Sequence, residues 1–267
     1  MAVPVTLSGV GLHTGRAVQM TVRPASADAG IVFGRTDRSG PPVRAALDAV
    51  TDTQGCVALG DAAGVRTVEH LLSAAWALGV DNLAVEVDGP ELPGLDGSAL
   101  PIVRALRAAG VRALPSPRTV IAVRAPVWVR DGDAWAVALP APRFSATYVV
   151  TLAPPGPGDQ AATYDPLRDA YEETIAPART WGYEKDAAAL RERGMARGAS
   201  LDNTLVIGGS GFLNAPRFVN EAARHKLLDL LGDLALLGGD VCGAVIAVRG
   251  GHRLHVALAR AIEGQGG

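Results

Sequence analysis

The amino-acid sequence predicts an α+β fold built from two similar domains, and three observations support this expectation. Strand-like segments rich in β-branched residues alternate with helical segments along the chain. The pattern restarts after the proline-containing segment 113–119, so we expect domains at 1–116 and 117–267. A helix-then-strand pattern occurs once in each half. A chain of 267 residues is long enough for one large domain or two ordinary ones.

The first half is expected to open with strands and to continue with two helices separated by a strand. Thr67 is a plausible N-cap for the first helix, and Gly79 a plausible C-terminal stop. Pro101 suits the first turn of the second helix. The expected elements are strands at 17–25 and 30–37, a helix at 67–78, a strand at 82–88, a loop at 89–101 and a helix at 101–110.

The second half repeats the mixture of strands and helices. A loop is expected at 153–160, where the sequence APPGPGDQ is rich in glycine and proline. The expected elements are strands at 119–129, 134–139 and 145–152, helices at 165–176 and 184–194, a strand at 203–208, a helix containing 224–233 and a strand at 242–250.

The internal repeat links segment 69–89 to segment 224–250. Each reads as a histidine, a run of leucines, a Leu-Gly ending and then a valine-rich strand. The interval from His225 to Gly238 exceeds that from His70 to Gly79 by four residues, close to one helical turn of ~3.6 residues. Chance similarity between two Leu/Ala-rich helices is an equal alternative. A true repeat implies two α+β halves that face each other helix to helix.

Composition and charge exclude several classes of protein. The chain is 48% hydrophobic and 19% charged, which indicates a packed globular protein. A net charge of −2 argues against a broad nucleic-acid-binding surface. No secretory signal is apparent, and no apolar run reaches the ~18 residues of a membrane helix. Cys56 and Cys242 are expected as free thiols in a cytoplasmic protein, for which we expect a monomer.

The segment RHKLLDLLGD carries a polar stripe among its leucines. His225, Asp229 and Asp233 recur at intervals of four, so a helix places them along one face. A His and an Asp four residues apart can bind one metal ion. The alternative is a helix whose carboxylates are solvated on an outer face.

The segment TVEHLL offers a third ligand. His70 lies near the start of a helix and is followed by apolar residues, so its ring is expected to point into the protein. Three protein ligands and one open position form the catalytic arrangement for zinc. Glu69, its neighbour, could then lean over the open side and accept a proton from water. For an isolated Glu-His pair, a purely structural role is the alternative.

A second Asp–His pair is also possible. Asp233 lies one turn beyond Asp229 and could orient His252, which follows the next strand and could protonate a leaving amine. A surface-loop histidine is the alternative. Lys226 and Arg249 lie beside these elements, and a phosphate-bearing substrate would explain them, although solvated surface charges are the default interpretation.

Long motifs occur in the order typical of one family. They are LSGVGLHTGRAVQMTVRPA, TVEHLLSAAWALGVDNLAVEVDGPELPGLDGSALP, ARTWGY, SLDN, and RHKLLDLLGD followed by GGH. The chain resembles the UDP-3-O-acyl-N-acetylglucosamine deacetylases, the zinc amidases of lipid A synthesis. The resemblance runs from about residue 7 to residue 258. It implies a UDP-linked acylated glucosamine as substrate, and two α+β domains whose helices are sandwiched between two outer sheets.

The resemblance also implies a role for each candidate residue. Zinc would be bound by His70, His225 and Asp229, although ferrous iron can also occupy such sites. The remaining roles are Glu69 as general base, His252 as general acid with Asp233 as its partner, Thr180 at the oxyanion, Lys226 near the phosphates, and Cys56 and Trp181 along the substrate site.

The sequence departs from the family pattern mainly in the Thr180 segment and at 184–200. Trp181 and Tyr183 replace phenylalanines, and alanines with Arg197 stand where larger apolar residues are expected along the acyl chain. Two alternatives to the deacetylase therefore remain. One is a zinc amidase acting on another N-acetyl sugar, and the other is a non-catalytic zinc-containing protein that binds a sugar nucleotide.

Overall fold

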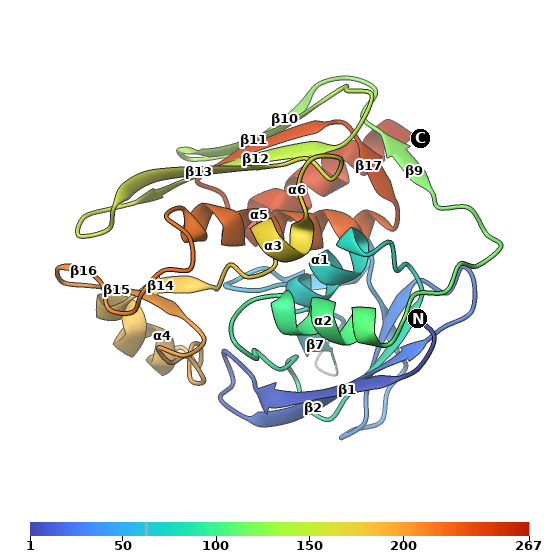
Figure 1. Cartoon of the computed structure of the whole chain (residues 1–267), viewed down its shortest axis with the longest axis horizontal. Helices are drawn as coiled ribbons and strands as arrows, with labels where there is room; N and C mark the ends of the chain where they lie inside the picture. The colour runs from blue at the N-terminus through green and yellow to red at the C-terminus, as the bar shows by residue number, and fades with distance from the viewer. Residues whose placement is uncertain (62–63, 267) are drawn as a thin grey trace.

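The computed structural model describes residues 1–61 and 64–266, and its helices lie between two large outer sheets (Figure 1). The first sheet consists of β1 (Val5–Val10), β2 (Ala17–Pro24), β3 (Ile31–Arg35), β4 (Val43–Arg44) and β8 (Leu83–Val87). The second consists of β10 (Val127–Asp131), β11 (Ala134–Leu139), β12 (Ser145–Leu152), β13 (Gly158–Tyr164) and β18 (Ala244–Val248). The predicted α+β fold, with one sheet from each half of the chain, is confirmed.

The two sheets share one topology. Their strand orders are β1-β2-β8-β3-β4 and β10-β11-β18-β12-β13. In each, the central strand pairs antiparallel with the second strand of a hairpin, as β8 does with β2 and β18 with β11. On its other side the central strand pairs parallel, with β3 or β12. The internal repeat is therefore confirmed, while the boundary at residue 116 stays our proposed division.

The helices form the layer between the sheets. The described helices are α1 (Glu69–Ala77), α2 (Leu100–Ala108), α3 (Tyr171–Thr174), α4 (Ala187–Glu192), α5 (Glu221–Leu234) and α6 (His252–Glu263). In Figure 1, α5 and α6 lie against the second sheet, and α1 and α2 lie between α5 and the first sheet. None of the helices in the described part of the chain has the length and apolarity required to cross a bilayer.

Shorter elements complete the fold. The remaining strands are β5 (Val50–Asp52), β6 (Ala58–Leu59), β7 (Val65–Arg66), β9 (Val120–Ala122), β14 (Trp181–Tyr183), β15 (Leu205–Gly208), β16 (Gly211–Phe212) and β17 (Asp240–Cys242). Short 3-10 helices lie at Leu47–Ala49, Glu184–Asp186, Ala235–Leu237 and Gly264–Gly266. The sheet β14-β15-β16 and helix α4 form a lobe beside the main layers (Figure 1).

Burial of apolar residues follows the expected periodicities. Strand β2 buries Val18, Met20 and Val22 on one face, as the period of two in a strand requires. Helix α5 is different, because both its leucines and its polar stripe are buried. A helix that is buried on all sides lies in the middle of a domain, and this is where α5 lies. The polar stripe predicted on this helix therefore faces protein, and the solvated outer face considered for it is wrong.

Three predictions about secondary structure were wrong. Helix α6 was not predicted, since Gly251 at its N-cap offers no capping side chain. Strand β13 begins within the predicted loop 153–160, because the turn is confined to residues 154–156 and Gly158 already pairs with Leu152 of β12. Thr67 is not the N-cap of α1: Val68 holds that position, and the Thr67 hydroxyl donates to Glu91 instead (3.0 Å).

Other boundaries were partly right. The predicted strand 119–129 is divided into β9 and β10, which belong to different sheets. The predicted helices 165–176 and 184–194 shorten to α3 and α4. Gly79, with a φ of +66°, does follow the end of α1, as a residue in the left-handed region commonly follows a helix. Proline lies in the first turn of α2, as expected.

Candidate functional site

Helices α1 and α5 bring the main candidates together from the two halves of the chain. Glu69 and His70 are the first two residues of α1, and His225 and Asp229 lie one turn apart on α5. All four side chains are buried, with at most 7% of any of these residues exposed. The close approach depends on Gly232 of α5, where an added Cβ would lie 2.1 Å from the backbone oxygen of Glu69.

Two imidazoles and one carboxylate form a compact group. The Nε2 atoms of His225 and His70 lie 3.4 Å and 3.9 Å from Asp229 Oδ1. The ring of His225 is held on its other side, since its Nδ1 lies 3.1 Å from the carbonyl oxygen of Ala178. A nitrogen bonded to that carbonyl must carry the proton, which leaves Nε2 with a lone pair directed at the group.

The protonation of these residues suits a cation. Burial, followed by the neighbouring His225, lowers the pKa of His70 to about 3, so its ring is neutral. Burial alone would raise the pKa of Asp229, but His225 and Lys226 outweigh it and hold that pKa well below its usual value. Neutral imidazole and ionised carboxylate are the forms that bind metals. The three donor atoms are therefore suited to holding a divalent metal ion.

Glu69 lies beside this group with one oxygen fixed. Its Oε2 accepts a hydrogen bond from the backbone N–H of Val57 (3.1 Å), and its Oε1 lies 3.7 Å from His252 Nε2. Burial is the largest influence and raises its pKa to about 7, although His252 opposes the shift. The first turn of a helix favours an ionised carboxylate, but here burial is the stronger effect.

His252 and Asp233 are paired. The Nδ1 atom of His252 lies 2.8 Å from Asp233 Oδ2, and its Nε2 faces Glu69 and Asp229. Burial alone would lower the pKa of this imidazole, but the carboxylates of Asp233, Glu69 and Asp229 raise it to about 9. His252 is also the first residue of α6 and is 5% exposed, so the surface-loop alternative is wrong.

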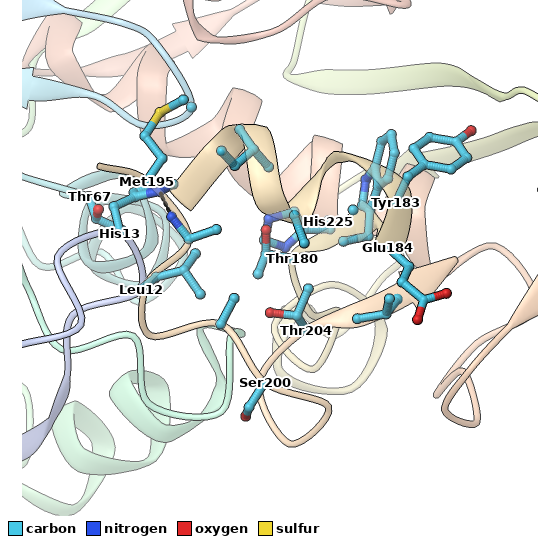
Figure 2. A pocket seen from close by; sticks show the side chains of 18 of the residues that line it. Leu12, His13, Thr67, Thr180, Tyr183, Glu184, Met195, Ser200, Thr204 and His225 are labelled. Carbon is cyan, nitrogen blue, oxygen red and sulfur yellow. Dashed lines mark hydrogen bonds between the residues drawn. The ribbon is translucent and has the colours of Figure 1, made fainter. Parts of the chain in front are cut away.

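These groups open into a cavity of ≈ 620 Å³, shown in Figure 2. Thr180, Thr204 and His225 are on its wall. Its remaining lining extends under α4 and over β15 and is largely apolar. The larger apolar side chains there include Leu190, Met195, Leu201, Val206 and Leu213. A polar centre with an apolar extension suits a ligand that has a polar and a hydrocarbon part.

The Thr180 segment is fixed by two independent attachments. The backbone N–H of Thr180 donates to the carbonyl of Gly97 (2.9 Å), which ties it to the first half of the chain. The preceding residue, Arg179, forms a buried ion pair with Glu221 at the start of α5 (2.9 Å). Thr180 is therefore held rigidly at the cavity wall, near the helix that carries His225.

Two of the four substrate-binding candidates line the cavity and two do not. Trp181 and Lys226 line the cavity, and Lys226 Nζ donates to Asp229 Oδ2 (2.9 Å). Cys56 is fully buried and does not line the cavity, and burial raises its pKa to about 12. Arg249 is exposed at the end of β18, also outside the residues that line the cavity.

The cavity also contains a histidine to which no role was assigned from the sequence. His13 lines the wall, and its Nδ1 accepts a hydrogen bond from the backbone N–H of Ala196 (3.4 Å). Its buried Nε2 has no partner among the described residues, and Figure 2 shows the ring next to Met195. The sequence feature that could have identified His13 is its position in GLHTG. A histidine in a glycine-rich turn belongs to no helical or strand period, so local secondary structure does not account for it.

Comparison with known proteins agrees with this geometry. The sequence model of the UDP-3-O-acyl N-acetylglycosamine deacetylase family matches residues 1–263. A UDP-3-O-acyl-N-acetylglucosamine deacetylase from Phenylobacterium zucineum is 46% identical, over 97% of this chain and 90% of its own length. Proteins of the same name are 44% identical in Thermosynechococcus vestitus (97% and 91% covered) and 40% identical in Leptospira biflexa (98% and 88% covered). The chain therefore belongs to the UDP-3-O-acyl N-acetylglycosamine deacetylase family.

Proposed function

We propose that this protein hydrolyses the acetamide of UDP-3-O-acyl-N-acetylglucosamine and releases acetate, an early committed step of lipid A biosynthesis in the cytoplasm. The observation that carries the proposal is the position of Glu69 and His252, 3.7 Å apart, beside the His70, His225 and Asp229 group, where all five residues line one cavity. A protein that only binds a sugar nucleotide has no need of an acid and a base at such a place. The names of the relatives support the same substrate.

The metal proposed for the group is zinc, with ferrous iron as the alternative. His70, His225 and Asp229 would hold it, because their donor atoms lie within 4.8 Å of one another and are in the protonation states that bind metals. The chemistry that such an ion supplies when bound is that of a Lewis acid, which makes water more acidic and polarises a carbonyl oxygen.

Glu69 is proposed as the general base. Its buried carboxylate has a pKa of about 7, so a large share is ionised at neutral pH and can still take up a proton. Accepting a proton from water allows the water oxygen to form a bond to the acetamide carbon. The hydrogen bond from Val57 holds Oε2, so Oε1 is the oxygen available for this transfer.

His252 is proposed as the general acid. Its pKa of about 9 keeps the ring protonated at neutral pH, and Nε2 faces the cavity while Nδ1 is bound to Asp233. When the carbon–nitrogen bond breaks, that Nε2 proton passes to the glucosamine nitrogen. Thr180, fixed at the wall, would donate its hydroxyl hydrogen to the developing oxyanion, an interaction typically worth about 3 kcal/mol of barrier lowering.

The rest of the cavity is proposed to hold the remainder of the substrate. Its apolar extension, lined by residues of α4 and β15, suits a hydrocarbon chain, and Trp181 would contact the substrate there. Lys226 would hold the phosphates. Its ammonium group donates to Asp229 in this structure, so it would have to give up that hydrogen bond or bind both groups at once. The roles of Cys56 and Arg249 in substrate binding, and the monomeric state, remain predictions from the sequence.

An assay of acetate release tests the proposal. Purified protein is expected to release acetate from the UDP-linked 3-O-acyl sugar, and to lose this activity on chelation and in Glu69→Gln. Glu86→Gln is the matched control, because this carboxylate lies on the outer sheet in an exposed ion pair with Arg23. Release from a non-acylated N-acetyl sugar alone would favour the related amidase. Binding of the UDP sugar with no release would favour the non-catalytic protein.

A further inference from the structure

Asp233 is bound by a second histidine, to which the proposed reaction gives no part. Its Oδ2 lies 2.8 Å from His252 Nδ1 and 2.7 Å from His255 Nδ1. His255 is one turn further along α6 and is completely buried. Two imidazoles therefore approach the same carboxylate oxygen, one from the cavity and one from the interior.

The interior side of this arrangement continues to the second sheet. His255 Nε2 lies 3.1 Å from the hydroxyl of Tyr148, a fully buried residue of β12. An ionised carboxylate only accepts hydrogen bonds, so His255 donates through Nδ1 and accepts from the tyrosine through Nε2. Burial lowers the pKa of His255, in agreement with a neutral ring. The result is a hydrogen-bonded relay from Tyr148 through His255 to Asp233.

Asp233, His252 and His255 form a hydrogen-bonded network and not a second metal site. Ligand atoms about 2.0–2.1 Å from a tetrahedral metal lie about 3.3 Å from each other. The separations of 2.7 Å and 2.8 Å around Asp233 Oδ2 are shorter than that and are typical of charge-assisted hydrogen bonds. In the group of His70, His225 and Asp229, the corresponding separations are 3.4 Å and 3.9 Å.

The carboxylate of Asp233 depends on this network for its orientation. Its other oxygen, Oδ1, is buried and has no hydrogen-bond partner among the described residues. Both identified contacts of the carboxylate are therefore made through Oδ2. If the bond from His255 were lost, one contact to His252 would remain, and the carboxylate could rotate with that ring.

We propose that His255, held in place by Tyr148, is a positioning residue that fixes the Asp233 carboxylate and so directs His252 Nε2 into the cavity. The inference rests on the proposed function for the role of His252 as the acid, but the hydrogen-bond geometry stands without it. The proposed role of His255 connects Tyr148 of the second sheet, through buried hydrogen bonds, to the end of the cavity where His252 lies.

Two substitutions of His255 separate positioning from simple packing. His255→Leu removes the hydrogen bond to Asp233, whereas His255→Asn retains a side-chain N–H that can donate to it. We expect His255→Leu to lower kcat on the UDP sugar by about 10- to 100-fold with KM unchanged, the usual effect of losing a group that orients a ligand or catalytic side chain. His255→Asn should recover most of the lost activity. Equal losses in both variants would overturn the proposal.

Tyr148→Phe tests the end of the relay that is furthest from Asp233. We expect a smaller fall in kcat than in His255→Leu. Tyr171→Phe is the matched control, because the Tyr171 hydroxyl is also buried and hydrogen-bonded to Ser73 (2.6 Å) but lies outside the relay.

In a His252→Gln background, His255→Leu should have no further effect on kcat, because both substitutions act through the same ring. Full additivity of the two effects would contradict the proposal.

A measurement without substrate separates this inference from the proposed function. In the wild-type protein, ¹H–¹⁵N spectra of the imidazoles should contain two strongly downfield Nδ1 protons, from His252 and His255. His255→Leu should remove one signal and shift or broaden the other. A sharp, unshifted His252 signal in this variant would overturn the relay even if acetate release is normal. Absence of acetate release from the wild-type protein would count only against the function.

Discussion

Gly232 of α5 lies directly against the backbone carbonyl of Glu69 at the start of α1. A Cβ at position 232 would approach that oxygen to 2.1 Å, and the carbonyl carbon to 2.8 Å. The neighbour is backbone, which cannot turn aside as a flexible side chain can. The distance between the two helices, and with it the spacing of Glu69 and His70 from His225 and Asp229, is therefore set at this glycine.

Gly232→Ala is expected to separate α1 from α5. Overpacking of this kind typically costs about 1–3 kcal/mol of unfolding free energy, and relief by movement of α1 would displace Glu69 and His70 together. We expect a lower free energy of unfolding in urea, a reduced metal content and a kcat well below that of the wild type. Circular dichroism with elemental analysis would measure the first two.

Gly209→Ala is the control for this substitution, because a Cβ there meets nothing within 4 Å and the backbone is not in the left-handed region. It should leave stability and activity close to wild type. Wild-type stability and metal content in Gly232→Ala would show that the helices are not held at this contact.

Asp229→Asn is expected to abolish metal binding. The substitution preserves the shape of the side chain but removes the charge, and an amide oxygen is a much weaker ligand for zinc than a carboxylate. Metal content by elemental analysis should fall far below that of the wild type, while the exposed Asp159→Asn should retain it. A full complement of metal in Asp229→Asn would remove this residue from the ligand set.

The pH dependence of kcat/KM is expected to be bell-shaped. Glu69 acts as a base only when ionised, so activity should rise as the pH passes its pKa of about 7. His252 acts as an acid only when protonated, so activity should fall as the pH passes its pKa of about 9. The maximum should lie between these values.

Substitution assigns the two limbs of this profile. His252→Gln should reduce activity and flatten the falling limb, while the rising limb stays in place. A melting temperature that is constant across the same pH range would show that the limbs do not reflect unfolding. If the falling limb is unchanged in His252→Gln, another group must supply the proton.

Local periodicity was sufficient to predict part of the site. The intervals between His225, Asp229 and Asp233 are a property of one helix, and the structure has that helix. The meeting of α1 with α5 is a property of the tertiary fold, and only the internal repeat and the family resemblance indicated it. The topology shared by the two sheets explains why the repeat was informative: equivalent helices necessarily pack on equivalent sheets.

Residues whose partners are distant in sequence were the ones that the sequence did not reveal. His255 is separated from Asp233 by 22 positions and from Tyr148 by 107, and it lies on a helix that was not predicted. His13 contacts Ala196, 183 positions away, through a turn without periodicity. Neither contact leaves a local pattern, because each depends on how separate elements pack.

The ion pair between Arg179 and Glu221 is expected to matter far more for stability than an exposed pair. Glu221 is fully buried and accepts hydrogen bonds from the side chain and backbone of Arg179 and from the backbone of Arg217. Glu221→Gln leaves the guanidinium buried without its counter-charge, which typically costs about 3–5 kcal/mol.

Urea unfolding should show this loss, together with a fall in kcat, because Thr180 directly follows Arg179. The exposed pair between Glu86 and Arg23 has the same separation within 0.1 Å, at 3.0 Å against 2.9 Å, but both of its side chains are close to half exposed. Solvent screening therefore predicts a loss of less than about 1 kcal/mol in Glu86→Gln. Similar losses in the two variants would mean that burial does not determine the strength of the Arg179 pair. An unchanged kcat in Glu221→Gln would mean that Thr180 is held mainly by its hydrogen bond to Gly97.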